Sequence, residues 1–198
     1  MTPKLLLISA AIAALSMTAC NRKPTETKGA ATPAEQSATP SANPSATVAT
    51  PSNEAAAPDF AAKAAASDMF EIEAGKLAEK RSTNPQVKEF AAMMIKDHTE
   101  STKALKSAIK DSGKALTLPA ALPSDKQDAL GDLVKADAKD FDRKYMESQV
   151  DAHQAALNVL QRYAQDGDVA QIKTFAAATA PKVQQHYDRA KVIRDALK

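Results

Sequence analysis

Three histidines carry the clearest chemical signal in this sequence of 198 residues. If each is placed on a helix at about 100° per residue, it falls near the centre of an apolar stripe. The stripes belong to three different expected helices. The stripe around His98 contains Met94 and Leu105, that of His153 contains Met146, Val150 and Leu157, and that of His186 contains Phe175, Val183, Ala190 and Ile193.

Neutral imidazole is a common metal ligand, and metal sites in helical bundles are built from inward-facing side chains on neighbouring helices. We therefore expect His98, His153 and His186 to converge on a shared site. The alternative is three unrelated core histidines. Each would then be satisfied by a nearby hydrogen-bond acceptor, for which the candidates are Asp97, Asp142, Asp151 and Asp188.

A fourth long helix, expected over residues 59–82, would supply a fourth ligand, either Glu71 or Glu73. The helical angle favours Glu73, which falls among Met69, Ile72 and Leu77. The height along the helix favours Glu71, because residues equidistant from the intervening turn lie side by side in a hairpin. The residues alone leave both candidates open.

The donor set differs from that of a di-iron centre, in which two helices each carry Glu-x-x-His. The residues three positions before His98 and His186 are Ile95 and Val183. Three imidazoles and one carboxylate suit a single zinc, copper or iron ion. A copper site could also use Met94 or Met146, although methionines on such stripes usually serve packing.

The elements that would position these residues are four long helices, and the predicted ranges are 59–82, 85–112, 137–165 and 168–197. Asn84-Pro85 marks one helix start, Gly113 and Gly167 mark two ends, and Asp168 is the expected cap of the last helix. A short helix over 124–134 lies in the long second connection. Two hairpins joined by one long crossover predict an all-α fold of the ferritin-like four-helix type.

Composition excludes several classes of protein. Aromatic residues make up 4%, tryptophan is absent and there are five glycines, which disfavours a turn-rich β fold. A net charge of +2 gives no indication of nucleic-acid binding. The sequence contains neither a glycine-rich phosphate loop nor a nucleophile elbow, so we expect a protein that is not an enzyme.

The first nineteen residues have the features of a signal peptide. Lys4 precedes an apolar run over residues 5–15, and small residues lead to Cys20, the only cysteine. This segment resembles the lipobox of bacterial lipoproteins, in which the cysteine is lipidated (palmitate among its acyl chains) and anchors the protein. Asn21 and Arg22 follow the cysteine, and neither is the Asp of an inner-membrane retention signal, so we expect attachment to the outer membrane and a periplasmic domain.

Residues 20–57 are expected to form a linker. Ala, Thr, Pro and Ser account for 25 of the 37 residues from 21 to 57, and Val48 is the only large aliphatic one. Such a segment cannot bury enough apolar surface to fold. The folded domain is therefore expected to span residues 58–198.

Several segments together resemble the bacterial family called domain of unknown function 4142, whose members are described as predicted outer-membrane proteins. They are Met69-Phe70-Glu71-Ile72-Glu73, Asp97-His98-Thr99, Phe141-Asp142-Arg143, Ala152-His153-Gln154, and Pro181 with His186. The resemblance implies a ferritin-like bundle and a location in the cell envelope, but no established activity. It also implies that Glu71, His98, His153 and His186 are the motif residues, with Glu73 as the rival of Glu71.

Three functions fit this sequence. The first is an envelope lipoprotein that binds a metal or small ligand at the histidines. The second is a structural or interaction module whose histidines only pack. The third is a metal-dependent oxidase or peroxide-handling enzyme, which rests on fold analogy alone.

Overall fold

The computed structural model describes residues 55–197, and within that range the protein is helical with no strand. The predicted all-α class is confirmed. The helices begin and end within two residues of the expected positions: α1 is Ala57–Arg81, α2 is Pro85–Asp111, α3 is Ser124–Lys135, α4 is Ala138–Asp166 and α5 is Ala170–Ala196.

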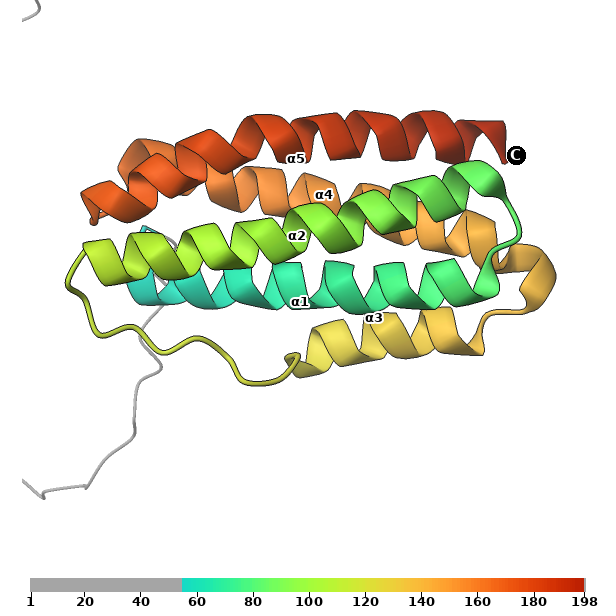
Figure 1. The fold of residues 1–198 in the computed structure, drawn as a ribbon, viewed down its shortest axis with the longest axis horizontal. Helices are drawn as coiled ribbons and strands as arrows, with labels where there is room; N and C mark the ends of the chain where they lie inside the picture. The colour runs from blue at the N-terminus through green and yellow to red at the C-terminus, as the bar shows by residue number, and fades with distance from the viewer. Residues whose placement is uncertain (1–54, 198) are drawn as a thin grey trace, which may run out of the picture. The chain divides into compact units, whose positions relative to one another are not determined.

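The four long helices pack side by side, and the short helix α3 lies outside them (Figure 1). Helix α1 pairs with α2, and α4 pairs with α5, through short turns. Helix α2 also packs against α5, and α1 against α4. The connection over residues 112–137 carries α3, which packs on α1 and α4 and brings the chain back to the start of α4.

The helix ends use three of the four expected signals, and Gly167 ends α4 as predicted. The Asn84 side chain accepts hydrogen bonds from the backbone N–H groups of Gln86 and Val87, and Gly113 follows α2 with a φ of 67°. The expected cap at Asp168 is wrong, because Val169 precedes α5 and no side chain caps it. The Asp168 carboxylate instead accepts from the backbone N–H of Ala57 and from the Tyr163 hydroxyl, which ties the start of α1 to the α4–α5 turn.

Two apolar clusters occupy opposite halves of the helical domain. The first contains Phe70, Phe90, Phe141, Tyr145 and Ile193, among others. The second contains Phe60, Leu105, Tyr163, Ile172 and Phe175, with the rings of Phe60 and Tyr163 stacked 4.1 Å apart. On each long helix the residues of one cluster come first and those of the other cluster follow, so the middle turn of every helix lies between the two clusters.

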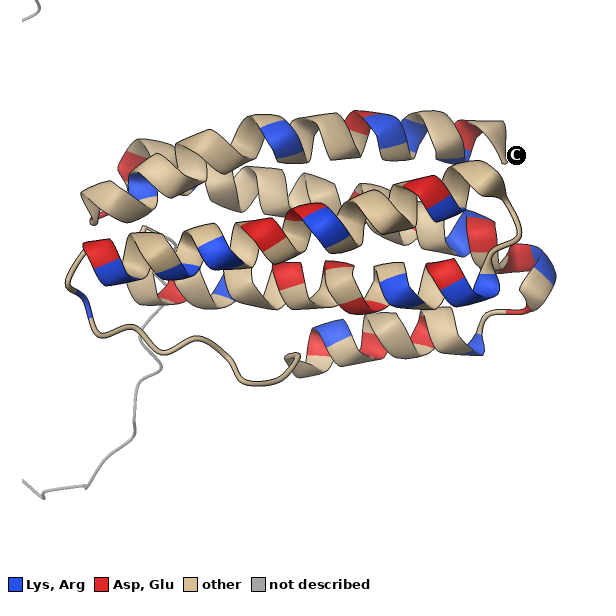
Figure 2. Cartoon of the chain, in the orientation of Figure 1, with Lys and Arg blue, Asp and Glu red and all other residues tan. Residues whose placement is uncertain are grey.

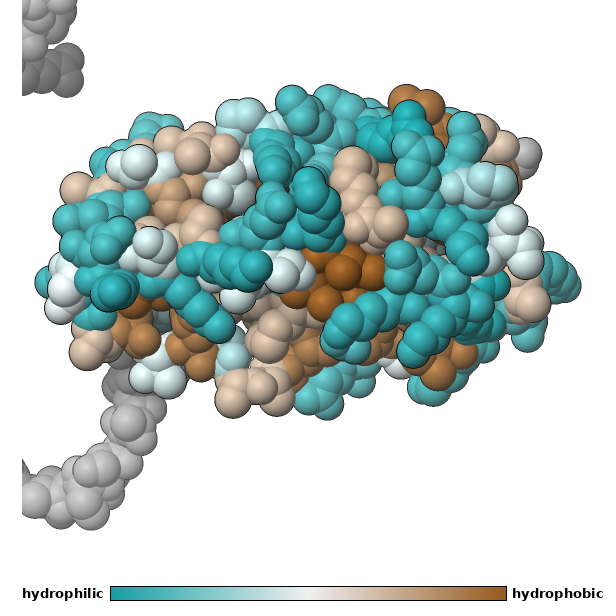
Figure 3. All heavy atoms as spheres, in the orientation of Figure 1, coloured by the Kyte–Doolittle hydropathy of each residue, from teal (hydrophilic) through white to brown (hydrophobic). Residues whose placement is uncertain are grey.

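The outer faces of the helices are charged, with both signs interspersed (Figure 2). The space-filling view is correspondingly hydrophilic, with apolar patches between the charged side chains (Figure 3). Within residues 55–197 no helix has the length and apolar character needed to cross a membrane. The expected signal peptide, the lipidation site at Cys20 and the linker as far as residue 54 lie outside the described residues.

Candidate metal centre

A layer of buried polar residues separates the two apolar clusters. It contains Asp68 and Glu71 on α1, His98 on α2, Gln149 and His153 on α4, and His186 on α5, and each is exposed by 4% or less. Each long helix therefore contributes at least one polar side chain at the same level. Burying polar groups is unfavourable unless they are paired or bind a ligand, so their partners decide what this layer does.

The three histidines meet at the centre of this layer. Their ring centroids are 5.5–5.6 Å apart. Three nitrogens, one from each ring, all lie within 4.8 Å of one another. In a tetrahedral zinc site with Zn–N bonds of about 2.0–2.1 Å, such nitrogens are about 3.3 Å apart. The three nitrogens would have to approach one another by at most about 1.5 Å to share one ion.

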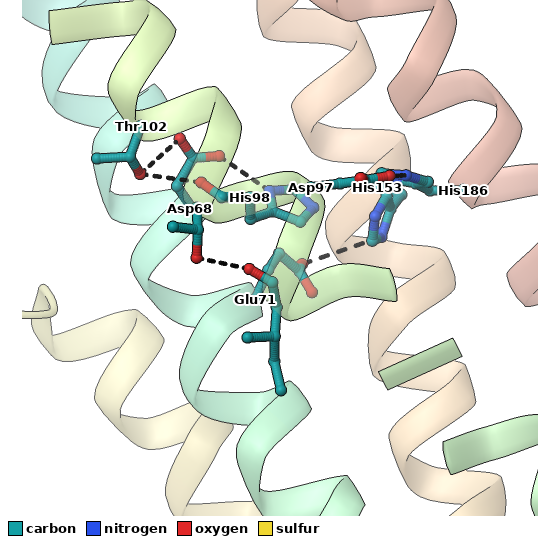
Figure 4. A network of polar contacts seen from close by, with 9 residues as sticks. Asp68, Glu71, Asp97, His98, Thr102, His153 and His186 are labelled. Atoms are coloured by element: carbon teal, nitrogen blue, oxygen red, sulfur yellow. Dashed lines mark hydrogen bonds and ion pairs between the residues drawn. The ribbon is translucent and has the colours of Figure 1, made fainter. Parts of the chain in front are cut away.

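His98 is oriented by a carboxylate from the neighbouring helix. Nδ1 lies 2.9 Å from Oδ1 of Asp68, and the other oxygen of Asp68 accepts from the Thr102 hydroxyl at 3.1 Å (Figure 4). A carboxylate can only accept, so Nδ1 carries a proton, and in the neutral ring Nε2 has the lone pair. Among the described residues Nε2 has no hydrogen-bond partner.

The other two histidines repeat this pattern with different partners. Nδ1 of His153 lies 2.8 Å from the backbone carbonyl oxygen of Gln149, and Nε2 of His186 lies 2.9 Å from Oδ2 of Asp97. Both acceptors fix the ring tautomer. Nε2 of His153 and Nδ1 of His186 are therefore left with free lone pairs, and both are buried without a partner in the described part of the chain.

Burial keeps two of these imidazoles neutral. It lowers the pKa of His153 to about 3, with further lowering by the charge of His98. Burial also lowers the pKa of His186 to about 4, against the opposing hydrogen bond to Asp97. Burial acts in the same direction on His98, but the hydrogen bond to Asp68 and the charge of Glu71 outweigh it and raise the pKa of His98. Neutral imidazole can bind a metal without first losing a proton.

The two glutamate candidates have different environments. Glu71 is 1% exposed, its Oε1 lies 3.9 Å from Nδ1 of His153, and its Oε2 has no partner among residues 55–197. Burial raises the pKa of Glu71 despite the opposing charge of His98. The Glu73 side chain is 48% exposed and pairs with Lys76 at 2.8 Å. The structure thus brings Glu71, but not Glu73, to the histidines.

The structure also gives the positions of the other residues that the sequence offered as ligands or as partners of the histidines. Met94 and Met146 are both buried in the first apolar cluster, as packing residues would be. Asp142, Asp151 and Asp188 were candidate partners of the histidines, but the residues that accept from the rings are Asp68, Gln149 and Asp97. Asp68 and Gln149 do not stand out in the sequence, although each lies one turn before a site residue on its own helix, namely Glu71 and His153.

The arrangement fits a metal ion. Four buried atoms with lone pairs, three imidazole nitrogens and Oε2 of Glu71, are unpartnered within the described chain. Each imidazole donates its other N–H to a carboxylate or carbonyl oxygen, the pattern that orients metal-bound histidine in proteins. An ordinary packed histidine would have its second nitrogen satisfied, because leaving a buried polar atom unpaired costs about 1–3 kcal/mol.

Comparison with known proteins places the chain in a family. The family described as "Domain of unknown function (DUF4142)" matches residues 42–193, and the chain therefore belongs to it. No curated protein and no solved structure matches the chain.

Proposed function

We propose that this member of a family without an assigned function is a metal-binding lipoprotein of the cell envelope. Its helical domain holds one transition-metal ion with His98, His153, His186 and Glu71 as ligands. The observation that carries this proposal is the set of three buried imidazoles that each direct one free lone pair into the same space. The chemistry of three nitrogens and one carboxylate oxygen suits zinc, copper or iron.

The proposed fold of this domain is the ferritin-like four-helix type. The support is the pairing of α1 with α2 and of α4 with α5, together with the long connection between the pairs. In such bundles the metal site lies in the core between facing helices, which is where the polar layer lies. The donor set differs from the paired Glu-x-x-His motifs of di-iron proteins, so we propose a mononuclear site.

The proposed anchor is a lipid at Cys20, followed by a linker that lets the domain stand off the outer membrane in the periplasm. The support is the sequence alone, namely the apolar run before Cys20 and the Pro- and Ala-rich stretch after it. A periplasmic domain would meet metal ions that enter the envelope. We propose a role in binding such ions rather than in catalysis.

Metal analysis of the protein purified without a histidine tag tests the central claim. After incubation with zinc, copper(II) or iron(II) and gel filtration, we expect about one equivalent of one of these ions per chain. His153→Ala should lose it, because the substitution removes one of the three proposed imidazole ligands. If neither wild type nor variant retains any of the three ions, the histidines only pack, and the protein is a structural module.

A further inference from the structure

A cavity of about 600 Å³, partly open to solvent, reaches the histidine layer at His98. Its wall comes from the four long helices, from the connection after α2 and from the first turn of α3. Pockets for small molecules in proteins usually measure about 300–1,000 Å³ and have mostly apolar walls with a few polar groups. The wall here fits this description, since most of its residues are Ala, Val, Leu, Phe or Pro.

Small side chains keep this space open. Six alanines line it, three from α1 and three from α4: Ala62, Ala64, Ala66, Ala152, Ala155 and Ala156. In the rest of the interior the same two helices contribute Phe60, Phe70, Tyr145 and Tyr163. Close packing is the rule in protein interiors, so a run of alanines around a large hollow is a departure from it.

The buried part of the cavity wall is polar. His98 and Asp68 both line the cavity, and both are 4% exposed. Their sequence neighbours Ser67, on α1, and Ser101, one turn along α2, line it as well. His98 is thus shared between the histidine cluster and the cavity, and a molecule in the cavity would reach the cluster through it.

The charged side chains of the wall balance one another, because Lys63 and Lys126 line the cavity together with Asp68 and Asp125. At the buried end the charged group of the wall is Asp68, which would repel an anionic head group placed there. A cation is disfavoured as well, because both oxygens of Asp68 already accept, one from His98 and the other from Thr102.

We propose that the cavity binds a neutral small molecule that has an apolar body and a single hydroxyl group. The body lies against the alanines of α1 and α4, and the hydroxyl is directed to the His98–Asp68 end, where acceptor lone pairs are available. A phenol or an aliphatic alcohol has this chemistry. The binding does not require the metal ion, because both the apolar wall and the carboxylates belong to the protein itself.

Fluorescence titration with 2-naphthol tests this proposal on the chelated and the metal-loaded protein. We expect saturable binding at one site in both. Ala156→Leu, which adds three carbon atoms to the cavity, should weaken binding at least tenfold. Ala92→Leu places the same side chain on an exposed part of α2 outside the cavity and should leave binding unchanged. If Ala156→Leu does not fold, as judged by circular dichroism, Ala62→Leu replaces it.

Two analogues test the head group. The anion 2-naphthoate should bind at least tenfold more weakly than 2-naphthol, and 2-methoxynaphthalene, which cannot donate a hydrogen bond, should bind about fivefold more weakly. Equal binding by Ala156→Leu and wild type, or no binding by wild type, would overturn the cavity assignment. Equal or tighter binding of 2-naphthoate or of 2-methoxynaphthalene would overturn the assigned ligand class. The metal content of each sample is measured separately. A protein that binds 2-naphthol but no metal would contradict the proposed metal site and leave the cavity assignment standing.

Discussion

Asp97 and His186 are 89 positions apart in the chain, yet Oδ2 of Asp97 accepts a hydrogen bond from Nε2 of His186 at 2.9 Å. Asp97 directly precedes His98, so one turn of α2 provides a proposed metal ligand and also orients a second ligand on α5. Lys182 lies 3.8 Å from the other oxygen of Asp97, and the hydrogen bond from His186 and the charge of Lys182 lower the pKa of Asp97 although burial opposes this.

Removing the Asp97 carboxylate should weaken metal binding without removing a ligand. Residues that orient metal-bound histidine typically contribute about 10–100-fold to metal affinity. We expect a loss of this size in Asp97→Ala, measured by competition with a chelator of known affinity. Asp151→Ala is the matched control, because Asp151 is an exposed carboxylate two positions before His153. Equal affinities in the two variants would contradict the orienting role of Asp97.

Glu71 and Glu73 should differ sharply when each is changed to glutamine. Glu71→Gln removes the buried carboxylate beside the histidines and should lower metal affinity at least tenfold. Glu73→Gln breaks only an exposed pair with Lys76 and should leave the affinity unchanged. The same chelator competition measures both. A larger effect at Glu73 would mean that the fourth ligand has been assigned to the wrong residue.

The metal-free protein should lose stability as the pH falls from about 6 to 5. The folded pKa of His153 is about 3, below the unfolded value of about 6.5, so the unfolded state binds one more proton across this window. His186, with a pKa of about 4, acts in the same direction. His98 has a raised pKa, so its folded form holds a proton more tightly than the unfolded form and opposes this loss. Glu71 also has a raised pKa and partly offsets the loss.

His153→Gln isolates one part of this effect. Wild type should lose about 1 kcal/mol more unfolding free energy than His153→Gln between pH 6 and 5, since one proton contributes about 1.4 kcal/mol per pH unit at most. Urea unfolding of chelated samples at the two pH values measures the difference. Parallel losses in the two proteins would show that His153 is already protonated, or accessible, in the folded state.

Arg81 should stabilise the join between α1 and α3. Its guanidinium donates to the carbonyl oxygens of Leu133, Val134 and Ala136 and lies 4.5 Å from the centre of the Phe141 ring. Arg81→Ala should lower the unfolding free energy by about 1–3 kcal/mol, as expected for hydrogen bonds from a charged group. Arg81→Lys keeps the charge but cannot reach three acceptors at once, so it should recover less than half of the loss in the same urea experiment.

Cys20→Ser tests the proposed anchor. The wild type should be lipidated and recovered in the outer-membrane fraction of the producing bacterium, whereas the variant should remain unlipidated and leave that fraction. Mass spectrometry of the N-terminal peptide and membrane fractionation measure the two effects. Residues 55–198 produced alone serve as the control for membrane association by the helical domain itself, and they retain Ala57 and its contact with Asp168. Unchanged mass and partitioning in Cys20→Ser would exclude the anchor.

The periodicity of the sequence was enough to predict the helices and to place three histidines on apolar stripes. Such patterns depend on neighbours three and four positions away, which lie on the same face of one helix. The choice between Glu71 and Glu73 required the relative rotation of α1 against α2 and α4, which no single helix specifies. The pairing of His98 with Asp68 likewise depends on contact between two helices.

Asp168 illustrates a different limit. A residue of its type before a helix commonly caps it, which is why the sequence predicts a cap there. In the folded protein the same carboxylate accepts from the backbone N–H of Ala57, 111 positions earlier in the chain. It also accepts from the hydroxyl of Tyr163, five positions earlier. A long-range contact therefore replaces the local one, and only the packed structure shows which of the two forms.

The polar layer also fixes how the helices align lengthwise. Apolar contacts alone tolerate a slide of one helix by a turn of about 5.4 Å, because one alanine or leucine replaces another. Such a slide here would move His98 or His186 out of the polar layer toward an apolar cluster, and a shift of His98 would leave Asp68 buried without this donor. The unpaired charge would make every misaligned arrangement costly. The histidines and carboxylates thus select one lengthwise alignment of the helices, whether or not an ion is bound.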